Sequence, residues 1–185
     1  ELAELAAVIA FSAERNGDKV GLLLFSDRVE AWIPPTKGRK HALRLVRDLL
    51  FFDTQGAGTS LSLALEFLAQ VEKKRSIVFL MSDFISDDFK NPLRILSRRH
   101  ELIALSMRDH AEMHLPSLGL IEVEDFETGQ RRWLDTASTK QRATFAKHAQ
   151  TQRGNLDRLF ASSGVDHVAF QTGEDHLAPL DRYLR

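Results

Sequence analysis

Apolar residues in this chain fall into short unbroken runs separated by stretches with helical spacing. The run from Ile77 to Ser82 is almost wholly apolar and is followed directly by Asp83. A short run without polar/apolar alternation predicts a strand buried on both faces, as in the centre of a parallel sheet. Ligands of open α/β sheets bind just beyond the carboxyl ends of such strands, so Asp83 is the first candidate for a functional residue.

Strands and helices are expected to alternate over the first 107 residues. The predicted helices cover 1–15, 38–52, 59–71 and 86–99, and the predicted strands cover 19–26, 29–33, 77–82 and 101–107. The run 29–33 alternates as a half-exposed edge strand does, and Pro34-Pro35 is expected to end it. This order predicts an α/β fold, namely a doubly wound, mostly parallel sheet with helices on both faces.

The pattern changes after residue 107. A β-hairpin is expected over 120–126 and 130–135, then a long polar helix over 138–163 interrupted at Gly154, a strand over 165–172 and a closing helix over 174–184. There is no internal repeat and no linker. The chain is therefore expected to form one domain, 1–185, with the hairpin as an insertion near 119–135.

The predicted helix 38–52 carries a basic face. Its apolar positions Leu43, Val46 and Leu50 are expected to point inward. Its basic positions are expected to point outward; they are Lys40, Arg44 and Arg47. This face is interpreted either as a solvated helix surface or as a docking site for an acidic partner.

Composition narrows the possible functions. The chain has 185 residues with a formal net charge of -1, so no global field favours nucleic acid or an anionic membrane. It has no cysteine, which excludes disulfides and thiolate chemistry and is consistent with a reducing, cytoplasmic location. Its apolar runs are far shorter than the ~20 residues of a membrane-spanning helix. Helical spacing begins at Leu2, so we expect a chain cut at or inside a helix, whose upstream segments, including any anchor, are not visible.

The glycine-rich segment Gly56-Ala-Gly58-Thr59 precedes a predicted helix. It lacks the lysine of a phosphate-binding P-loop, and Leu61 stands where a dinucleotide fingerprint needs its third glycine. The alternative is structural: the glycines allow a tight entry and Thr59 caps the helix, which is worth ~1 kcal/mol.

Thr59 and Asp83 form a more specific pair, since both lie in loops at the carboxyl edge of the predicted sheet. A hydroxyl, a carboxylate and waters are suitable ligands for Mg²⁺, although such a site needs a further carboxylate that no other motif supplies. His110 and His114 flank Glu112, but their order is not that of a zinc-protease motif. No catalytic residue is predicted.

Several phrases of the chain resemble a known family. They are 17–25 (GDKVGLLLF), 33–39 (IPPTKGR), 58–61 (GTSL), 82–84 (SDF), 108–116 and 126–129 (FETG). Together they are similar to the von Willebrand factor A-like domain of the bacterial domain-of-unknown-function family 58. The resemblance implies a six-stranded sheet in the order 3-2-1-4-5-6 and a metal-ion-dependent adhesion site at its carboxyl edge.

In such a site an Asp-x-Ser-x-Ser loop after the first strand joins a threonine and an aspartate from two later loops. Thr59 and Asp83 fit the last two positions. The first strand and its loop are expected upstream of residues 1–15, between the strands 19–26 and 76–82. Unpaired backbone groups cost ~1–3 kcal/mol each, so we expect the natural protein or a partner to fill this gap.

The resemblance implies a non-enzymatic protein-interaction module that uses Mg²⁺ and works with a MoxR-type AAA+ ATPase in the assembly or maturation of other proteins. The alternative is a Mg²⁺-dependent hydrolase or phosphotransferase that uses Asp83. A third possibility is that the site is vestigial in this chain, with weak or absent metal binding.

Overall fold

The computed structural model describes residues 2–56, 58–86, 88–108, 116–124, 131–171 and 180. The helices are α1 (Leu2–Arg15), α2 (Arg39–Leu50), α3 (Leu61–Val71), α4 (Lys90–Ser97) and α6 (Thr139–Ser163). The strands are β1 (Val20–Phe25), β2 (Val29–Thr36), β3 (Ile77–Met81), β4 (Glu101–Arg108), β5 (Leu120–Glu124), β6 (Arg131–Asp135) and β7 (Asp166–Gln171). The predicted order of elements is confirmed up to β7. The predicted closing helix, apart from Leu180, and the segment of His110 and His114 lie outside the described residues.

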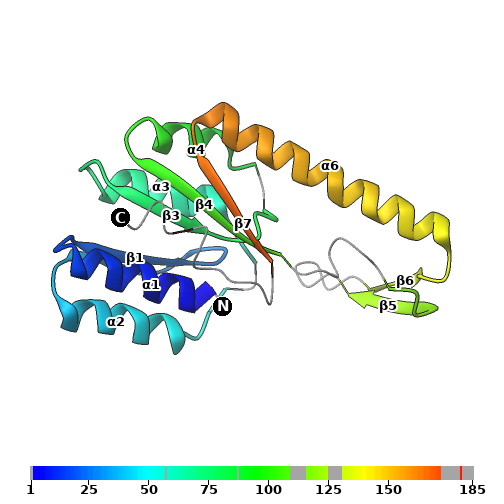
Figure 1. Ribbon diagram of the computed structural model, residues 1–185, viewed down its shortest axis with the longest axis horizontal. Helices are drawn as coiled ribbons and strands as arrows, with labels where there is room; N and C mark the ends of the chain where they lie inside the picture. Colours follow the sequence, from blue (N-terminus) through cyan, green and yellow to red (C-terminus); the bar gives the residue numbers. More distant parts are fainter. Residues whose placement is uncertain are drawn as a thin grey trace.

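The strands form three ladders (Figure 1). β3, β4 and β7 make a parallel sheet in that order, whereas β1 pairs with β2, and β5 with β6, in antiparallel ladders. In the parallel sheet Ile77 is paired with Glu101, and Ile103 with Asp166. The fold is therefore mixed α/β, with a parallel sheet of three strands flanked by helices.

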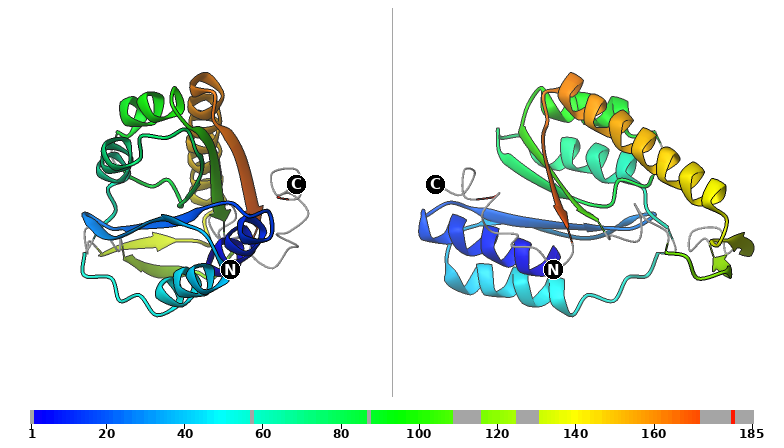
Figure 2. Two further views of the ribbon diagram at one scale, coloured as in Figure 1. Left: turned by 90° about the vertical axis from the view of Figure 1, so that its left-hand side faces the viewer. Right: turned by 45° about the vertical axis from the view of Figure 1, so that its right-hand side comes forward.

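Helices cover both faces of the parallel sheet (Figure 2). Alternate side chains of β4 point to opposite faces: Leu102 and Ala104 join a core with α3, α4 and α6, while Ile103 and Leu105 pack with α1. Side chains of β1, including Leu23, also pack against the first core. α3 thus connects the β1-β2 ladder to the parallel sheet.

β1 and β3 share no ladder among the described residues. β1 is paired only with β2, and β3 only with β4. All six residues of β1 are half-buried, and Ile77 at the start of β3 is exposed. The predicted burial of 77–82 on both faces is therefore incomplete, because this strand has a neighbour on one side. β4, with neighbours on both sides, is buried throughout 102–106.

β2 continues through Pro34 and Pro35 to Thr36, so the prediction that the prolines end this strand is wrong. An edge strand tolerates proline because its outer side needs no amide donor. A Cβ on Gly21 of β1 would lie 2.8 Å from the carbonyl oxygen of Ile33 and 3.0 Å from the nitrogen of Pro35. Because Gly21 has no side chain, β1 and β2 can lie this close together.

The side of α2 that packs against the rest of the molecule differs from the predicted side. Ala42 and Leu45 are buried, whereas Leu43 and Leu50 are 50% and 58% exposed, so the expectation that these two point inward is wrong. The small Ala42 lies on the packed side, and the ring Nε2 of His41 is 2.8 Å from the carbonyl oxygen of Val20. The basic side chains point outward as predicted; they are Lys40, Arg44 and Arg47.

Two helix boundaries also differ. α4 begins at Lys90 rather than near 86, and the carboxylate of Asp88 accepts a hydrogen bond from the Lys90 amide at 3.2 Å. α6 runs unbroken through Gly154, because a single glycine weakens a helix by only about 1 kcal/mol. The β5-β6 hairpin lies at the amino-terminal end of α6, away from the parallel sheet (Figure 1).

Candidate functional site

Three loops meet at the carboxyl edge of the strands: the loop after β1, the loop before α3 and the loop after β3. The Ser60 amide donates to the Ser26 carbonyl oxygen at 2.8 Å, which joins the first two loops. The Ser86 hydroxyl donates to the Thr59 carbonyl oxygen at 3.0 Å and accepts from the Leu61 amide at 3.2 Å, which joins the second and third. The segments of Thr59 and Asp83 are therefore bound together, as their positions in the sequence predict.

Thr59 does not cap α3. The N-cap is Ser60, whose hydroxyl accepts from the Leu63 amide at 3.4 Å, so the predicted capping residue is wrong by one position. Ser60 has the extended backbone that an N-cap residue adopts. The Thr59 hydroxyl is left out of the cap, and the side chain is half-buried at the site.

Asp83 is an exposed carboxylate on a hydrogen-bonded turn. Its Oδ1 accepts from the Ser82 hydroxyl at 3.3 Å and from the Ile85 amide at 3.1 Å. The Ser82 hydroxyl in turn accepts from the Phe84 amide at 3.0 Å. Both of these hydrogen bonds fall on Oδ1, and neither involves Oδ2.

Phe84 anchors this turn to the core. Its φ of 59° lies in the left-handed region, which costs a residue with a side chain about 1–2 kcal/mol. Its ring is buried, 5.0 Å from the Phe160 ring and 6.1 Å from the Phe89 ring between centroids. Burial of the ring offsets the backbone strain and fixes the position of Asp83.

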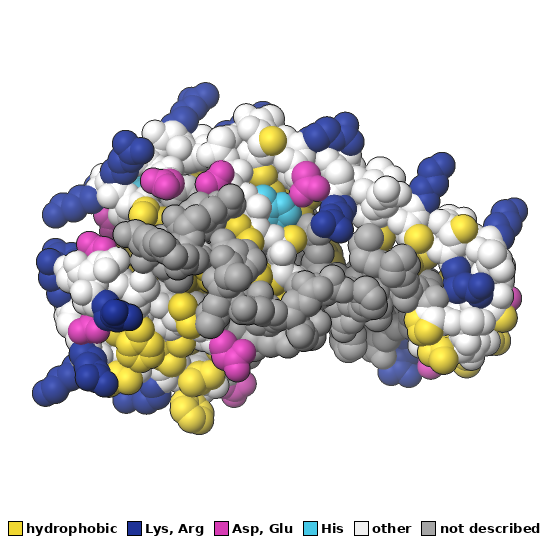
Figure 3. Space-filling model, viewed as in Figure 1, with side chains coloured by type: hydrophobic (Ala, Val, Ile, Leu, Met, Phe, Trp, Pro, Cys, Tyr) yellow, Lys and Arg dark blue, Asp and Glu magenta, His cyan; other side chains and the backbone are white. Residues whose placement is uncertain are grey.

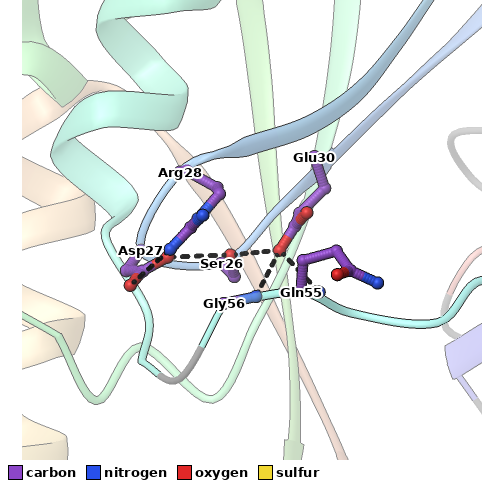
Figure 4. Close-up of polar contacts among 6 residues, drawn as sticks. All are labelled: Ser26, Asp27, Arg28, Glu30, Gln55 and Gly56. Atoms are coloured by element: carbon purple, nitrogen blue, oxygen red, sulfur yellow. Dashed lines mark hydrogen bonds and ion pairs between the residues drawn. The ribbon is translucent and has the colours of Figure 1, made fainter.

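Glu30 fixes the loop before α3 (Figure 4). Its Oε1 accepts from the Ser26 hydroxyl at 2.6 Å, the Gly56 amide at 2.8 Å and the Gln55 amide at 3.1 Å. These bonds, that of Ser26 foremost, lower the pKa of the Glu30 carboxyl. A Cβ on Gly56 would overlap the side chains of Ser26 and Asp27, so the close approach of the two loops requires glycine.

The sequence prediction missed Ser26, Asp27 and Glu30. A usable signal was present, since Ser-Asp follows β1 just as it follows β3. The Asp27 carboxylate is paired with its neighbour Arg28 at 2.9 Å. A second acidic side chain therefore stands at the same edge as Asp83, although it occupies a different loop.

The donor set fits a hard cation only in part. The Thr59 hydroxyl and the Asp83 carboxylate are oxygen ligands of the kind that Mg²⁺ prefers. Over the described ranges, no group of three or more His, Asp or Glu side chains is placed to hold a metal. The two residues therefore supply part of a coordination shell.

A Ser-His-Asp array lies elsewhere, beneath α6. The Ser106 hydroxyl is 2.9 Å from Nε2 of His167, whose Nδ1 is 2.9 Å from the Asp157 carboxylate. This connectivity matches that of serine hydrolases, but Ser106 is 1% exposed in the middle strand of the sheet. A nucleophile must reach its substrate, so the array is best explained as a hydrogen-bonded network that satisfies buried polar groups.

These features define a mixed α/β domain with an oxygen-rich site at the carboxyl edge of its strands. Residues 1–155 match the family described as "Protein of unknown function DUF58", and the chain belongs to that family. It is 27% identical over 182 residues to "Uncharacterized protein Rv1480" of Mycobacterium tuberculosis, a match that covers 97% of this chain and 57% of the relative. It is 28% identical over 156 residues to "Uncharacterized protein MAV169" of Mycobacterium avium, covering 83% and 92% of the two chains.

The fold is similar to the crystal structure of the conserved hypothetical protein BatB from Bacteroides thetaiotaomicron. The TM-score is 0.56 at 12% identity, over 99% of this chain and 83% of BatB. Among the described residues, no helix has the length and apolar character to cross a membrane. The chain spans little more than half of the Mycobacterium tuberculosis relative.

Proposed function

We propose that this domain is a protein-interaction module with a Mg²⁺-dependent site of the von Willebrand factor A type. One observation carries the proposal: hydrogen bonds through Ser86 hold the Thr59 loop against the loop of Asp83. In this site the Thr59 hydroxyl and Oδ2 of Asp83 are the metal ligands. The bound metal supplies an open coordination position for a partner carboxylate.

A further strand between β1 and β3 completes the sheet in this proposal. The ladders β2-β1 and β3-β4-β7 fit the order 3-2-1-4-5-6 with strand 1 in the gap. Each buried backbone group left unpaired costs about 1–3 kcal/mol, a large share of a typical stability of about 5–15 kcal/mol. The loop after that strand supplies the remaining ligands.

Each residue at the edge has a defined task in this site. Asp83 presents one oxygen outward because its other oxygen is held by Ser82 and Ile85. Glu30 holds the amides of the loop before α3, and thereby fixes the position of Thr59. The ligands are thus oriented before the partner arrives, which lowers the entropic cost of binding.

The partner in this proposal is a MoxR-type AAA+ ATPase, in the cytoplasm, acting with this protein in the assembly or maturation of others. The choice of this ATPase as the partner is based on the family resemblance. A protein partner also agrees with the surface charge: on the face in Figure 3, Lys and Arg side chains are dispersed along the periphery rather than gathered into one basic patch. In this proposal the partner is recognised by the adhesion-type site, whose metal binds an acidic side chain, and not by a basic patch.

The test uses the natural full-length protein. Isothermal titration with Mg²⁺, and binding to the ATPase with and without EDTA, are measured for the wild type, Asp83→Ala and a control, Asp18→Ala. Asp18 is an exposed aspartate just before β1, at the opposite end of that strand. We expect Asp83→Ala and EDTA each to weaken both interactions at least tenfold, while Asp18→Ala leaves them unchanged. Unchanged ATPase affinity in Asp83→Ala and in EDTA contradicts the adhesion-site mechanism.

The second candidate is a Mg²⁺-dependent hydrolase or phosphotransferase. The observation in its favour is the second carboxylate at the same edge, that of Asp27. Turnover of a phosphate ester by the full-length protein, lost in both Asp83→Ala and Asp27→Ala, would support this candidate. Absence of turnover in the wild type contradicts it.

A further inference from the structure

Ile85 is a bulky apolar side chain displayed beside Asp83. It is 62% exposed, whereas the preceding Phe84 is buried. Phe84 has a left-handed backbone and its ring is in the core, while Asp83 and Ile85 on either side of it are exposed. The turn thus displays an acidic and an apolar group two residues apart.

The position of Ile85 is fixed from both sides. Its amide donates to Oδ1 of Asp83 at 3.1 Å, and its neighbour Ser86 is bound to the Thr59 loop. A second link joins the Ser62 hydroxyl to the Asp88 carbonyl oxygen at 3.0 Å. Ile85 therefore stands in the turn between Asp83, which its amide contacts, and Ser86, which binds the Thr59 loop.

An exposed isoleucine whose backbone is held by a hydrogen bond can contribute to the binding of a partner. Burying an aliphatic side chain of this size favours binding, and hydrogen bonds already hold the turn, so little of that gain is lost to immobilising Ile85. Leu63 in the first turn of α3 is also partly exposed and follows the bonded Ser62 directly. The edge therefore offers apolar contact area next to its carboxylate and hydroxyl.

We propose that Ile85 determines the specificity of this site, by packing against a bulky apolar residue adjacent to the acidic residue that the partner supplies. This inference rests on the proposed function, since it names the partner of the same site. The occupant is a protein segment with Asp or Glu next to Leu, Ile, Phe or Met. A phosphate or a small carboxylate offers nothing to bury against Ile85, so these ligands are disfavoured.

The test is a selection from a phage-displayed library of random linear peptides on the Mg²⁺-loaded full-length protein, with elution by EDTA. We expect the eluted peptides to share an acidic residue beside a bulky apolar one. A synthetic peptide of the dominant sequence is then titrated against the wild type, Ile85→Ser, Ile85→Leu and Ile95→Ser. Ile95 on α4 is 61% exposed and serves as the matched control.

We expect Ile85→Ser to bind the peptide roughly five- to tenfold more weakly, with Ile85→Leu and Ile95→Ser close to the wild type. EDTA-eluted peptides that contain an acid without an apolar neighbour, or equal affinity of Ile85→Ser, overturn the role of Ile85 and leave the metal site standing. If EDTA elutes no binder, the proposed function fails together with this inference. Titration of Mg²⁺ alone into Ile85→Ser distinguishes loss of the apolar contact from loss of the metal site. The Mg²⁺ affinity of this variant is expected to equal that of the wild type.

Discussion

β1 and β4 carry the same kind of apolar run but lie in different surroundings. β4 has a strand on each side and helices on both faces, and its residues 102–106 are all buried. Among the residues that the structure describes, β1 has a strand on one side, and every one of its residues is half-buried. The apolar sequence of each strand predicts that it is buried between other strands and helices. The observed burial shows which of those neighbours are present. The difference between the two strands supports a further strand beside β1.

The largest expected effect is on the core around β4. Leu105 is fully buried between β3 and β7, so Leu105→Ala is expected to cost about 3 kcal/mol of unfolding free energy. Leu23 of β1 packs only partly against the core, so Leu23→Ala is expected to cost about 1 kcal/mol. Urea unfolding of the 185-residue chain measures both.

The same pair of variants in the natural full-length protein sharpens the comparison. If the proposed strand lies between β1 and β3, the cost of Leu23→Ala rises toward that of Leu105→Ala. Equal costs in the 185-residue chain alone would mean that β1 already has a complete environment, and would remove the main support for the proposed strand.

A smaller effect is expected where β1 meets β2. A Cβ on Gly21 would lie 2.8 Å from a carbonyl oxygen of β2, so Gly21→Ala is expected to cost about 2 kcal/mol. The matched control is Gly154→Ala in α6, where the added Cβ meets nothing within 4 Å and helix propensity rises by about 1 kcal/mol. Thermal unfolding should therefore shift in opposite directions. A neutral Gly21→Ala would show that the β1-β2 ladder is loose enough to move apart.

The elements that could be predicted from sequence are those with an unambiguous period. α1, β4 and β7 follow their patterns, and α1 ends at Arg15, two residues before Gly17, whose φ of 73° favours glycine. The facing side of α2 could not be predicted, because apolar residues occupy both of its sides. Packing of the small Ala42 decided which side is buried.

The candidate site shows the same division. Thr59 and Asp83 were predictable because each lies in a loop at a strand end, a local property of the sequence. Glu30 was not, since its role depends on amides 25 and 26 residues further along the chain. The prolines of β2 are similar, because Pro34 and Pro35 are tolerated where β2 lies at the edge of its ladder with β1. Local sequence patterns therefore predict the helices and strands. The contacts that their side chains make depend on residues distant in the sequence.

The smallest expected effect concerns the loop that Glu30 holds beside β1. Hydrogen bonds lower the pKa of Glu30 from its ordinary value of 4.5, so the unfolded chain binds its proton more readily than the folded chain. This contribution to stability is complete above pH 4.5 and is lost as the pH falls through the lower folded value. Glu30→Gln is expected to flatten that part of the pH profile of unfolding.

The control is Glu66→Gln, which removes a carboxylate from the exposed face of α3 and leaves the hydrogen bonds of Glu30 intact. In the full-length protein, Glu30→Gln should also weaken Mg²⁺ binding a few-fold, because the amides of Gln55 and Gly56 lose their anionic acceptor and the Thr59 loop gains freedom. Circular dichroism at a series of pH values measures the first effect, and calorimetry the second. A wild-type profile that Glu30→Gln does not alter would show that these three hydrogen bonds make no net contribution, and that the Thr59 loop is positioned by its contacts with Ser26 and Ser86 alone.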